Sequence, residues 1–183
     1  MKSEKRYSFW SLAVIFFGMS LAGWLWEVSL HLFAGGGFVN RGFLHGPWLP
    51  IYGFGSVLIV TLFYRLRCKP LLEFLAIILL CGGIEYCISW LLEKLYHGMK
   101  WWDYSGYFLN VNGRICAEGL LAFGAGGMLL VYVLAPFLDQ CSKRIPRKVL
   151  VPVCLALTFV FCVDLIYSVG IPNTGNGITR HGL

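Results

Sequence analysis

Four acidic residues lie where they could do chemistry inside long apolar segments: Glu27, Glu85, Glu118 and Asp164. An ionisable side chain inside a bilayer is costly, so each needs a partner or a water-filled cavity. Counted at about 1.5 Å per residue, three of them lie roughly 21 to 25 Å along their segments. Glu118 lies one turn from the outer end of its own segment. The four acids are therefore predicted to share one depth, in the outer half of the membrane.

Basic, amide and aromatic residues are predicted at the same depth. Together with the acids they give a predicted substrate site of Glu27, Asn40, Arg41, His45, Glu85, Trp102, Asp103, Asn112, Arg114, Glu118 and Asp164. The acids outnumber the two arginines, which favours an outward-facing polar pocket with spare negative charge. A structural alternative stays open, in which Arg41 and Arg114 neutralise these acids only to hold the bundle together.

Metal chemistry is only weakly indicated. Glu27 and His31 lie four residues apart, on one helix face, and in principle could ligate a metal with Glu85 or Asp164. No HExxH or comparable spacing is present, so we predict no metal and no cofactor. The sequence has no recognisable catalytic motif such as GxSxG either, and it leaves open whether the chain is an enzyme.

The composition predicts the elements that carry these residues. The 183 residues are 58% hydrophobic and only 13% charged, which is too apolar for a soluble domain. We predict an all-α, polytopic transmembrane bundle that forms one domain over residues 1–183. Its five spans are expected near residues 8–34, 47–66, 70–96, 113–138 and 148–170. Pro47 and Pro70 are expected just inside the starts of the second and third helices.

The basic residues predict the orientation. Ten of the fifteen Lys and Arg residues fall on the side of the N-terminus: Lys2, Lys5, Arg6, Arg65, Arg67, Lys69, Lys143, Arg144, Arg147 and Lys148. On the other side are Arg41, Lys94, Lys100, Arg114 and Arg180. The positive-inside rule then predicts a multi-pass protein of the cell membrane with a cytoplasmic N-terminus and an outside C-terminus. This distribution of basic residues also accounts for the net charge of +6, so we predict no nucleic-acid partner.

An internal repeat is predicted from two similar units, each a helix with a glutamate, an outer loop and a returning helix. The first reads GWLWE, FVNRGFLHG and YGFGSVLIV, and the second reads CGGIE, NVNGRICAEG and GAGGMLLVY. Glu27 then corresponds to Glu85. Small residues on the returning helices predict close helix packing: Gly53, Gly55, Ala122, Gly124, Gly126 and Gly127. If the repeat is real, helices one and two pair as helices three and four do.

Three blocks carry a resemblance to a known family. GWLWE (23–27), NRGFLHGPWLPIYGFG (40–55) and WWDYSGYFLNVNGRICAEG (101–119) resemble recurring blocks of a bacterial membrane-protein family named putative type IV ABC transporter, or CmpB. The similarity covers most of the chain. The resemblance implies a transport-associated membrane component, and it implies neither a substrate nor catalytic residues.

Three functions remain open at this level. The first is a permease-like or substrate-capturing transport component. It lacks a GxxxxGK[ST] motif, so a separate ATPase or other subunits would dock on the basic loops 65–69 and 143–148. The second is a membrane-embedded enzyme acting on a lipid or lipid-linked substrate at the outer leaflet. The third is a scaffold or assembly protein whose buried polar groups only specify helix pairing.

Overall fold

The computed structural model describes residues 6–35, 37–173 and 179–180. Its helices are α1 (Phe9–Phe33), α2 (Pro50–Leu62), α3 (Pro70–Leu95), α4 (Ala117–Leu129), α5 (Ala135–Arg144) and α6 (Arg147–Gly170). A short 3-10 turn, η1 (Leu66–Cys68), precedes α3, and a π-helical turn, η2 (Leu130–Leu134), joins α4 to α5. Two short strands, β1 (Met99–Lys100) and β2 (Thr179–Arg180), pair antiparallel. The predicted all-helical fold is confirmed.

Within the described part of the chain, four helices are long and apolar enough to cross a membrane: α1, α3, the continuous helix from Ala117 to Arg144, and α6. Their outer faces carry large apolar side chains, such as Leu79 (77% exposed) and Ile166 (75% exposed). A surface of this kind requires lipid as its solvent. The chain is therefore a multi-pass membrane protein.

The second predicted helix is shorter than expected. α2 begins at Pro50 and ends at Leu62, so its 13 residues reach only about 20 Å. Pro47 lies before the helix, in an irregular segment, whereas Pro70 does begin α3 as predicted. The helix is short because the preceding segment, residues 40–49, descends into the bundle as a loop. We call this segment the 40–49 loop. The backbone N–H of Leu49 donates to the carbonyl oxygen of Ser20, near the middle of α1, at 3.0 Å.

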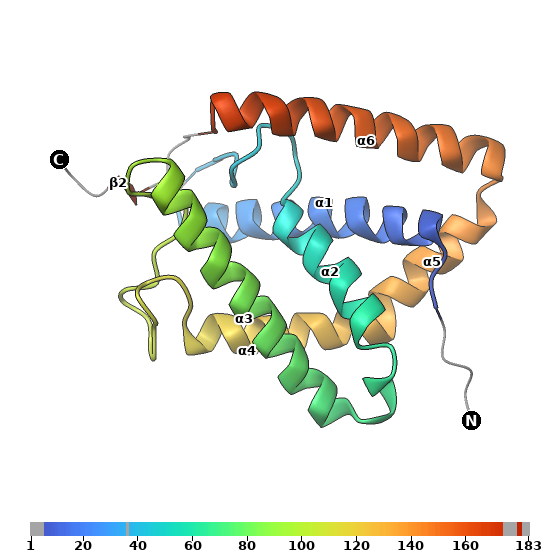
Figure 1. Cartoon of the computed structure of the whole chain (residues 1–183), viewed down its shortest axis with the longest axis horizontal. Coiled ribbons are helices and arrows are strands. Elements are labelled where there is room, and N and C mark those ends of the chain that lie inside the picture. The colour runs from blue at the N-terminus through green and yellow to red at the C-terminus, as the bar shows by residue number, and fades with distance from the viewer. Residues whose placement is uncertain (1–5, 36, 174–178, 181–183) are drawn as a thin grey trace.

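The fourth predicted helix is displaced toward the C-terminus. It starts at Ala117 rather than near 113, because Asn112 and Gly113 adopt positive φ angles (55° and 66°) that a helix does not accept. It also continues beyond 138 to Arg144. Pro136 lacks an N–H and would crowd the carbonyl of Tyr132 in a regular helix. The π turn η2 lies at this position, and the helix changes direction there (Figure 1).

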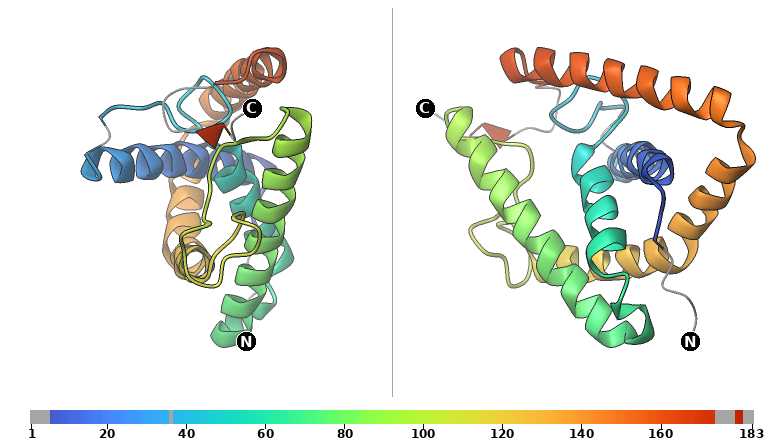
Figure 2. Two further views of the ribbon diagram at one scale, coloured as in Figure 1. Left: turned by 90° about the vertical axis from the view of Figure 1, so that its left-hand side faces the viewer. Right: turned by 45° about the vertical axis from the view of Figure 1, so that its right-hand side comes forward.

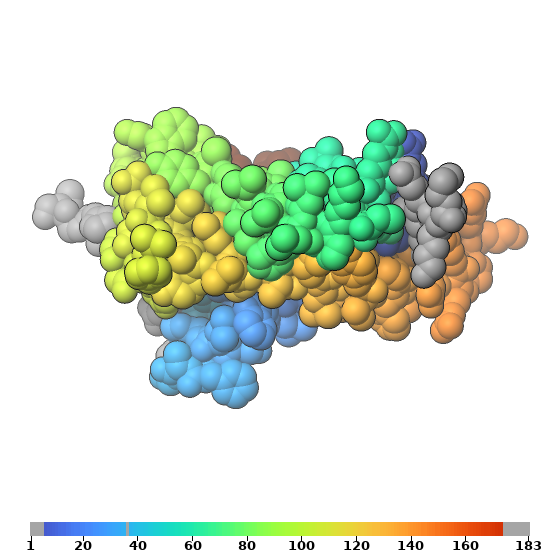
Figure 3. Space-filling model, turned by 90° about the horizontal axis from the view of Figure 1, so that it is seen from below, coloured from blue at the N-terminus to red at the C-terminus, as the bar shows by residue number. Residues whose placement is uncertain are grey.

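The helices are arranged around α1. It packs against α2, α5 and α6, and α3 packs against α4. Figure 2 shows α6 on the opposite side of α1 from α3 and α4. Seen from below, α3 (green) and the α4–α5 helix (yellow to orange) lie side by side on one face (Figure 3). We call the end at which α1, α3 and α6 begin the basic end, since the loops 65–69 and 143–148 lie there.

Small residues allow the close approach of α1 to α2 and of α3 to α4, as the repeat predicts. An added Cβ on Gly53 of α2 would lie 2.8 Å from the carbonyl oxygen of Phe16 in α1. An added Cβ on Gly127 of α4 would similarly meet Ile77 of α3. Gly55 and Gly126 have no such neighbour within 4 Å, so they do not contribute to the close approach. The expected pairing of α1 with α2 and of α3 with α4 is present.

Candidate functional site

The structure brings the two repeat glutamates together. Tyr52 of α2 donates its hydroxyl to Glu27 Oε1 at 2.8 Å, and Tyr104 donates to Glu85 Oε1 at 3.1 Å. Glu27 lies within electrostatic range of Glu85, and both tyrosines lie within range of both glutamates. Glu85 is 5% exposed. We call these four residues the acid–tyrosine cluster.

Among the residues that the structure describes, the acid–tyrosine cluster has no basic counterpart. In residues 6–35, 37–173 and 179–180, neither Glu27 nor Glu85 forms an ion pair with Lys, Arg or His. Two carboxylates that interact in a poorly solvated site repel each other unless a positive charge or a proton joins them. The cluster can therefore attract a cation or retain a proton.

The loop between α3 and α4 contributes Tyr104 to the acid–tyrosine cluster. Its backbone is closed by the Tyr104 N–H, which donates to the Gly113 carbonyl at 2.8 Å, and by the Val111–Ile115 bridge. Trp102 Nε1 donates to the carbonyl of Arg114 at 3.1 Å. These bonds direct Tyr104 toward α3. Burial among the loop and helices raises the pKa of Tyr104, so its hydroxyl remains a donor to Glu85 at neutral pH.

Arg114 has a partner that the sequence analysis did not predict. Its Nη2 atom lies 2.6 Å from Glu93 Oε2, near the end of α3, and its guanidinium lies 5.3 Å from the centre of the Tyr86 ring. Asn112 donates to the Tyr86 hydroxyl at 2.8 Å. Arg114 therefore attaches the loop to α3, and Glu93 takes its charge in place of Glu27, Glu85 or Glu118.

Asp164 is separate from the acid–tyrosine cluster. Its carboxylate accepts the backbone N–H groups of His45 (3.1 Å) and Gly46 (2.9 Å) and the indole N–H of Trp48 (2.7 Å). Ser168 adds a fourth donor at 3.2 Å. The imidazole of His45 also bonds to Ser168 at 3.0 Å. Irregular backbone at membrane depth needs such internal partners, so Asp164 holds the 40–49 loop.

Asn40 belongs to the same loop network. Its side chain accepts from Trp24 Nε1 and donates to the carbonyl of His45, both at 2.7 Å. Asn173, just after α6, donates to the carbonyls of Asn40 and Gly42. Arg41 is half-buried beside them. These contacts join the 40–49 loop to the end of α6.

Asp103 and Glu118 lie on the loop side of the bundle. Asp103 accepts the backbone N–H and the hydroxyl of Ser105, and Lys100 lies 4.0 Å away. Glu118 is exposed and accepts the N–H of Phe108 at 3.3 Å. Both shape the α3–α4 loop. The predicted residues are thus distributed over three groups: the acid–tyrosine cluster, the Asp164 network and the α3–α4 loop.

Two buried acids near the basic end were not predicted as site residues. Asp139 of α5 is fully buried and accepts from Ser11 of α1 at 2.8 Å and from Lys143 at 2.8 Å. Glu73 of α3 is also fully buried and accepts from Tyr132 at 2.8 Å. The i, i+4 spacing of Asp139 and Lys143 was the available signal. Tyr52, the partner of Glu27, gave no such signal, because tyrosine at an apolar helix face is ordinary packing.

Within the described residues, no three His, Cys, Asp or Glu side chains gather as a metal site would require.

The chain was compared with known proteins. No curated protein and no solved structure matches it. Residues 14–169 match the family described as "Putative ABC-transporter type IV". The match runs from α1 to α6 and leaves out only the first residues of α1 and the last residue of α6. The chain therefore belongs to the putative type IV ABC-transporter family, as its sequence blocks indicated.

Proposed function

We propose that this chain is the membrane-embedded component of a transporter, and that the acid–tyrosine cluster is its polar site for a positively charged group. One observation carries the proposal: Glu27 and Glu85 meet inside the bundle without a basic partner among the described residues. Ionisable residues that face a bundle interior commonly mark substrate or ion pathways.

The position of the cluster supports transport. Glu27 and Glu85 come from two different helix pairs, and Tyr52 and Tyr104 come from the returning helix and the α3–α4 loop. A change in the packing of the α1–α2 pair against the α3–α4 pair would therefore separate the two carboxylates. A site between two repeat units is the arrangement that alternating access uses.

ATP hydrolysis would require a partner. The sequence has no P-loop. We propose that a separate ATPase or other subunit docks at the basic end. Arg65, Arg144, Arg147 and Lys148 are exposed there, and they suit an acidic surface on such a partner.

The proposal is tested by replacing Glu85 with Gln. We expect Glu85→Gln to lose any co-purified cationic solute, because the amide keeps the shape of the side chain but removes its charge. Native mass spectrometry of protein purified gently from its own membranes measures bound solutes and subunits. Glu118→Gln is the matched control, since Glu118 is exposed and outside the cluster, and it should retain the solute.

Each other outcome favours a different function. A variant that inserts and folds normally, with no bound molecule in either protein, supports the scaffold function and contradicts transport. A retained phospholipid or lipid-linked compound that is converted on incubation supports the enzyme function instead.

We further propose a cytoplasmic N-terminus. The basic end carries most of the Lys and Arg residues, which remain on the cytoplasmic side during insertion. A fluorescent protein fused before Met1 is then expected to fluoresce, and alkaline phosphatase fused after Leu183 is expected to be active. Phosphatase activity from the N-terminal fusion would contradict this orientation.

A further inference from the structure

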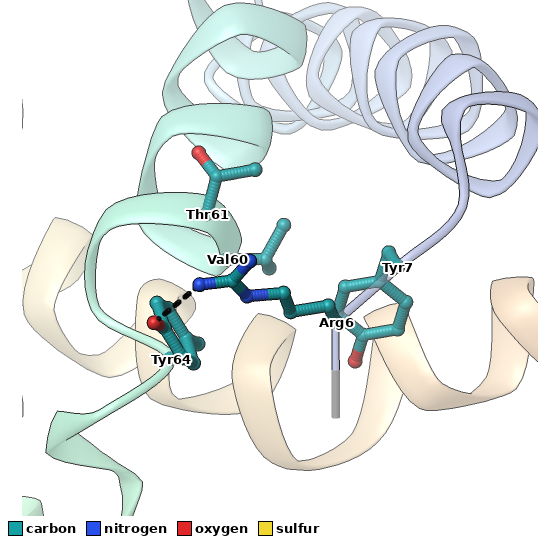
Figure 4. A pocket seen from close by; sticks show the side chains of 5 residues that line it. All are labelled: Arg6, Tyr7, Val60, Thr61 and Tyr64. Carbon is teal, nitrogen blue, oxygen red and sulfur yellow. Dashed lines mark hydrogen bonds between the residues drawn. The ribbon is translucent and has the colours of Figure 1, made fainter. Parts of the chain in front are cut away.

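A hollow of about 250 Å³ opens at the basic end, between the start of α1 and the end of α2 (Figure 4). Its lining residues are Arg6, Tyr7, Val60, Thr61 and Tyr64. Figure 4 shows the side chain of Arg6 extended across the hollow toward Tyr64. The lining thus combines a cation and hydroxyl groups with the apolar side chain of Val60.

Two guanidinium groups meet at one oxygen beside this hollow. Arg6 Nη2 donates to the Tyr64 hydroxyl oxygen at 2.8 Å, and Arg65 Nε donates to the same oxygen at 2.9 Å. Both guanidiniums also lie over the Tyr64 ring, at 5.0 and 5.4 Å from its centre. Two cationic donors are therefore within reach of a single acceptor group.

A third arginine lies against the other tyrosine of the hollow. Arg67 Nη2 donates to the Tyr7 hydroxyl at 3.3 Å, and the Arg67 guanidinium carbon lies 5.4 Å from the centre of the Tyr7 ring. The Nε atom of Arg67 is buried and has no hydrogen-bond partner. Neither Arg65 nor Arg67 forms an ion pair with an acid in the part of the chain that the structure describes.

Arg6 and Arg65 act on the Tyr64 hydroxyl as positive charges. The hydrogen bond from Arg6, aided by the one from Arg65, holds the pKa of Tyr64 below its usual value. Lowering of this kind means that a negative charge at the Tyr64 oxygen is favoured. The same position would favour an anionic oxygen of a ligand.

We propose that this hollow binds the phosphate group of an anionic phospholipid. Guanidinium groups match phosphate oxygens by paired hydrogen bonds, and the tyrosine hydroxyls can donate to the same group. Exposed apolar side chains at the same helix ends, Phe9 (73% exposed) and Leu62 (56% exposed), are available to the acyl chains. Basic pockets between helices at a membrane surface are known to take such head groups.

The test compares two double variants that remove equal charge from the same end of the protein. Arg6→Gln with Arg65→Gln changes the hollow, and Arg144→Gln with Arg147→Gln changes exposed residues at the α5–α6 turn. Delipidated full-length protein in neutral detergent is titrated with phosphatidylglycerol, and bound lipid is counted by native mass spectrometry. We expect the Kd to rise about tenfold or more in the first variant and less than about twofold in the second.

Two comparisons identify the ligand. Phosphatidylcholine should bind about equally to wild type and both variants, because its head group has no net charge. Inorganic phosphate should compete only weakly, since it lacks acyl chains. If inorganic phosphate binds as tightly as the lipid and is lost with the same variant, the hollow takes a free anion and the lipid proposal is wrong.

Equal loss of phosphatidylglycerol from both double variants would also overturn the proposal, because it would show only general surface charge. If the first variant fails to fold, Arg6→Lys with Arg65→Lys replaces it. This pair keeps both charges without the planar fork and should bind several-fold more weakly than wild type.

Discussion

Replacing Asp164 with Ala is expected to destabilise the protein by roughly 3 to 6 kcal/mol. The carboxylate accepts from two backbone N–H groups and one indole N–H of the 40–49 loop, and its side chain is only 12% exposed. Each donor left unsatisfied in a buried site costs about 1 to 3 kcal/mol. Lipid offers these N–H groups no alternative acceptor, so we expect the 40–49 loop to move out of the bundle.

The Asp164→Asn variant keeps the shape of the side chain and removes its charge, so it distinguishes the effect of the charge from the effect of packing. One amide oxygen can still accept, but the NH₂ group faces donors, so we expect about half the loss seen with Ala. Chemical unfolding in detergent, followed by circular dichroism and tryptophan fluorescence, measures both variants. Glu118→Gln is the control, because that exposed carboxylate accepts a single backbone N–H at 3.3 Å. Asp164→Ala and Glu118→Gln with equal stabilities would contradict the assigned role of Asp164.

Gly53→Ala is expected to cost about 2 to 3 kcal/mol, although alanine is the better helix former. The new methyl carbon would lie 2.7 Å from Phe16 Cδ2 and 2.8 Å from the Phe16 carbonyl oxygen, and would overlap Ser20 Oγ. The carbonyl belongs to the backbone of α1 and cannot turn aside, so α2 must move away. Tyr52 would move with it and lose its hydrogen bond to Glu27.

Gly55→Ala is the matched control on the same helix. A Cβ there meets no atom within 4 Å, so this variant should gain about 0.5 to 1 kcal/mol from helix propensity. Unfolding in detergent gives the two free energies. Engineered cysteines across α1 and α2 would report the change in spacing by their rate of disulfide formation. Similar behaviour of the two alanine variants would contradict the close approach at Gly53.

The acid–tyrosine cluster and the Asp164 network differ in how fully their carboxylates are hydrogen-bonded. The Asp164 carboxylate is saturated by four hydrogen-bond donors. The carboxylates of Glu27 and Glu85 each accept from one tyrosine. A saturated carboxylate stabilises the fold, whereas the less satisfied pair retains capacity for a ligand. Substitution in the first group should therefore change stability, and substitution in the second should change binding.

Several features followed from the sequence alone. The membrane class and the long helices α1, α3, α4–α5 and α6 were predictable, because lipid-facing helices must be apolar over a length that the bilayer sets. The pairing of α1 with α2 and of α3 with α4 was predictable from the repeat and its glycines. The matching places of Glu27 and Glu85 in the two units predicted a common depth for these two residues.

Other features were decided only by the tertiary structure. Hydropathy cannot show that the 40–49 loop descends to Ser20 and leaves α2 with 13 residues, because a buried loop held by Asp164 is as apolar as a helix. Depth along the helices also could not show that Asp164 lies apart from Glu85. It could not show that Arg114 forms its ion pair with Glu93. Residues at one depth on different helices can face different neighbours, and the rotation of each helix about its axis is set by packing.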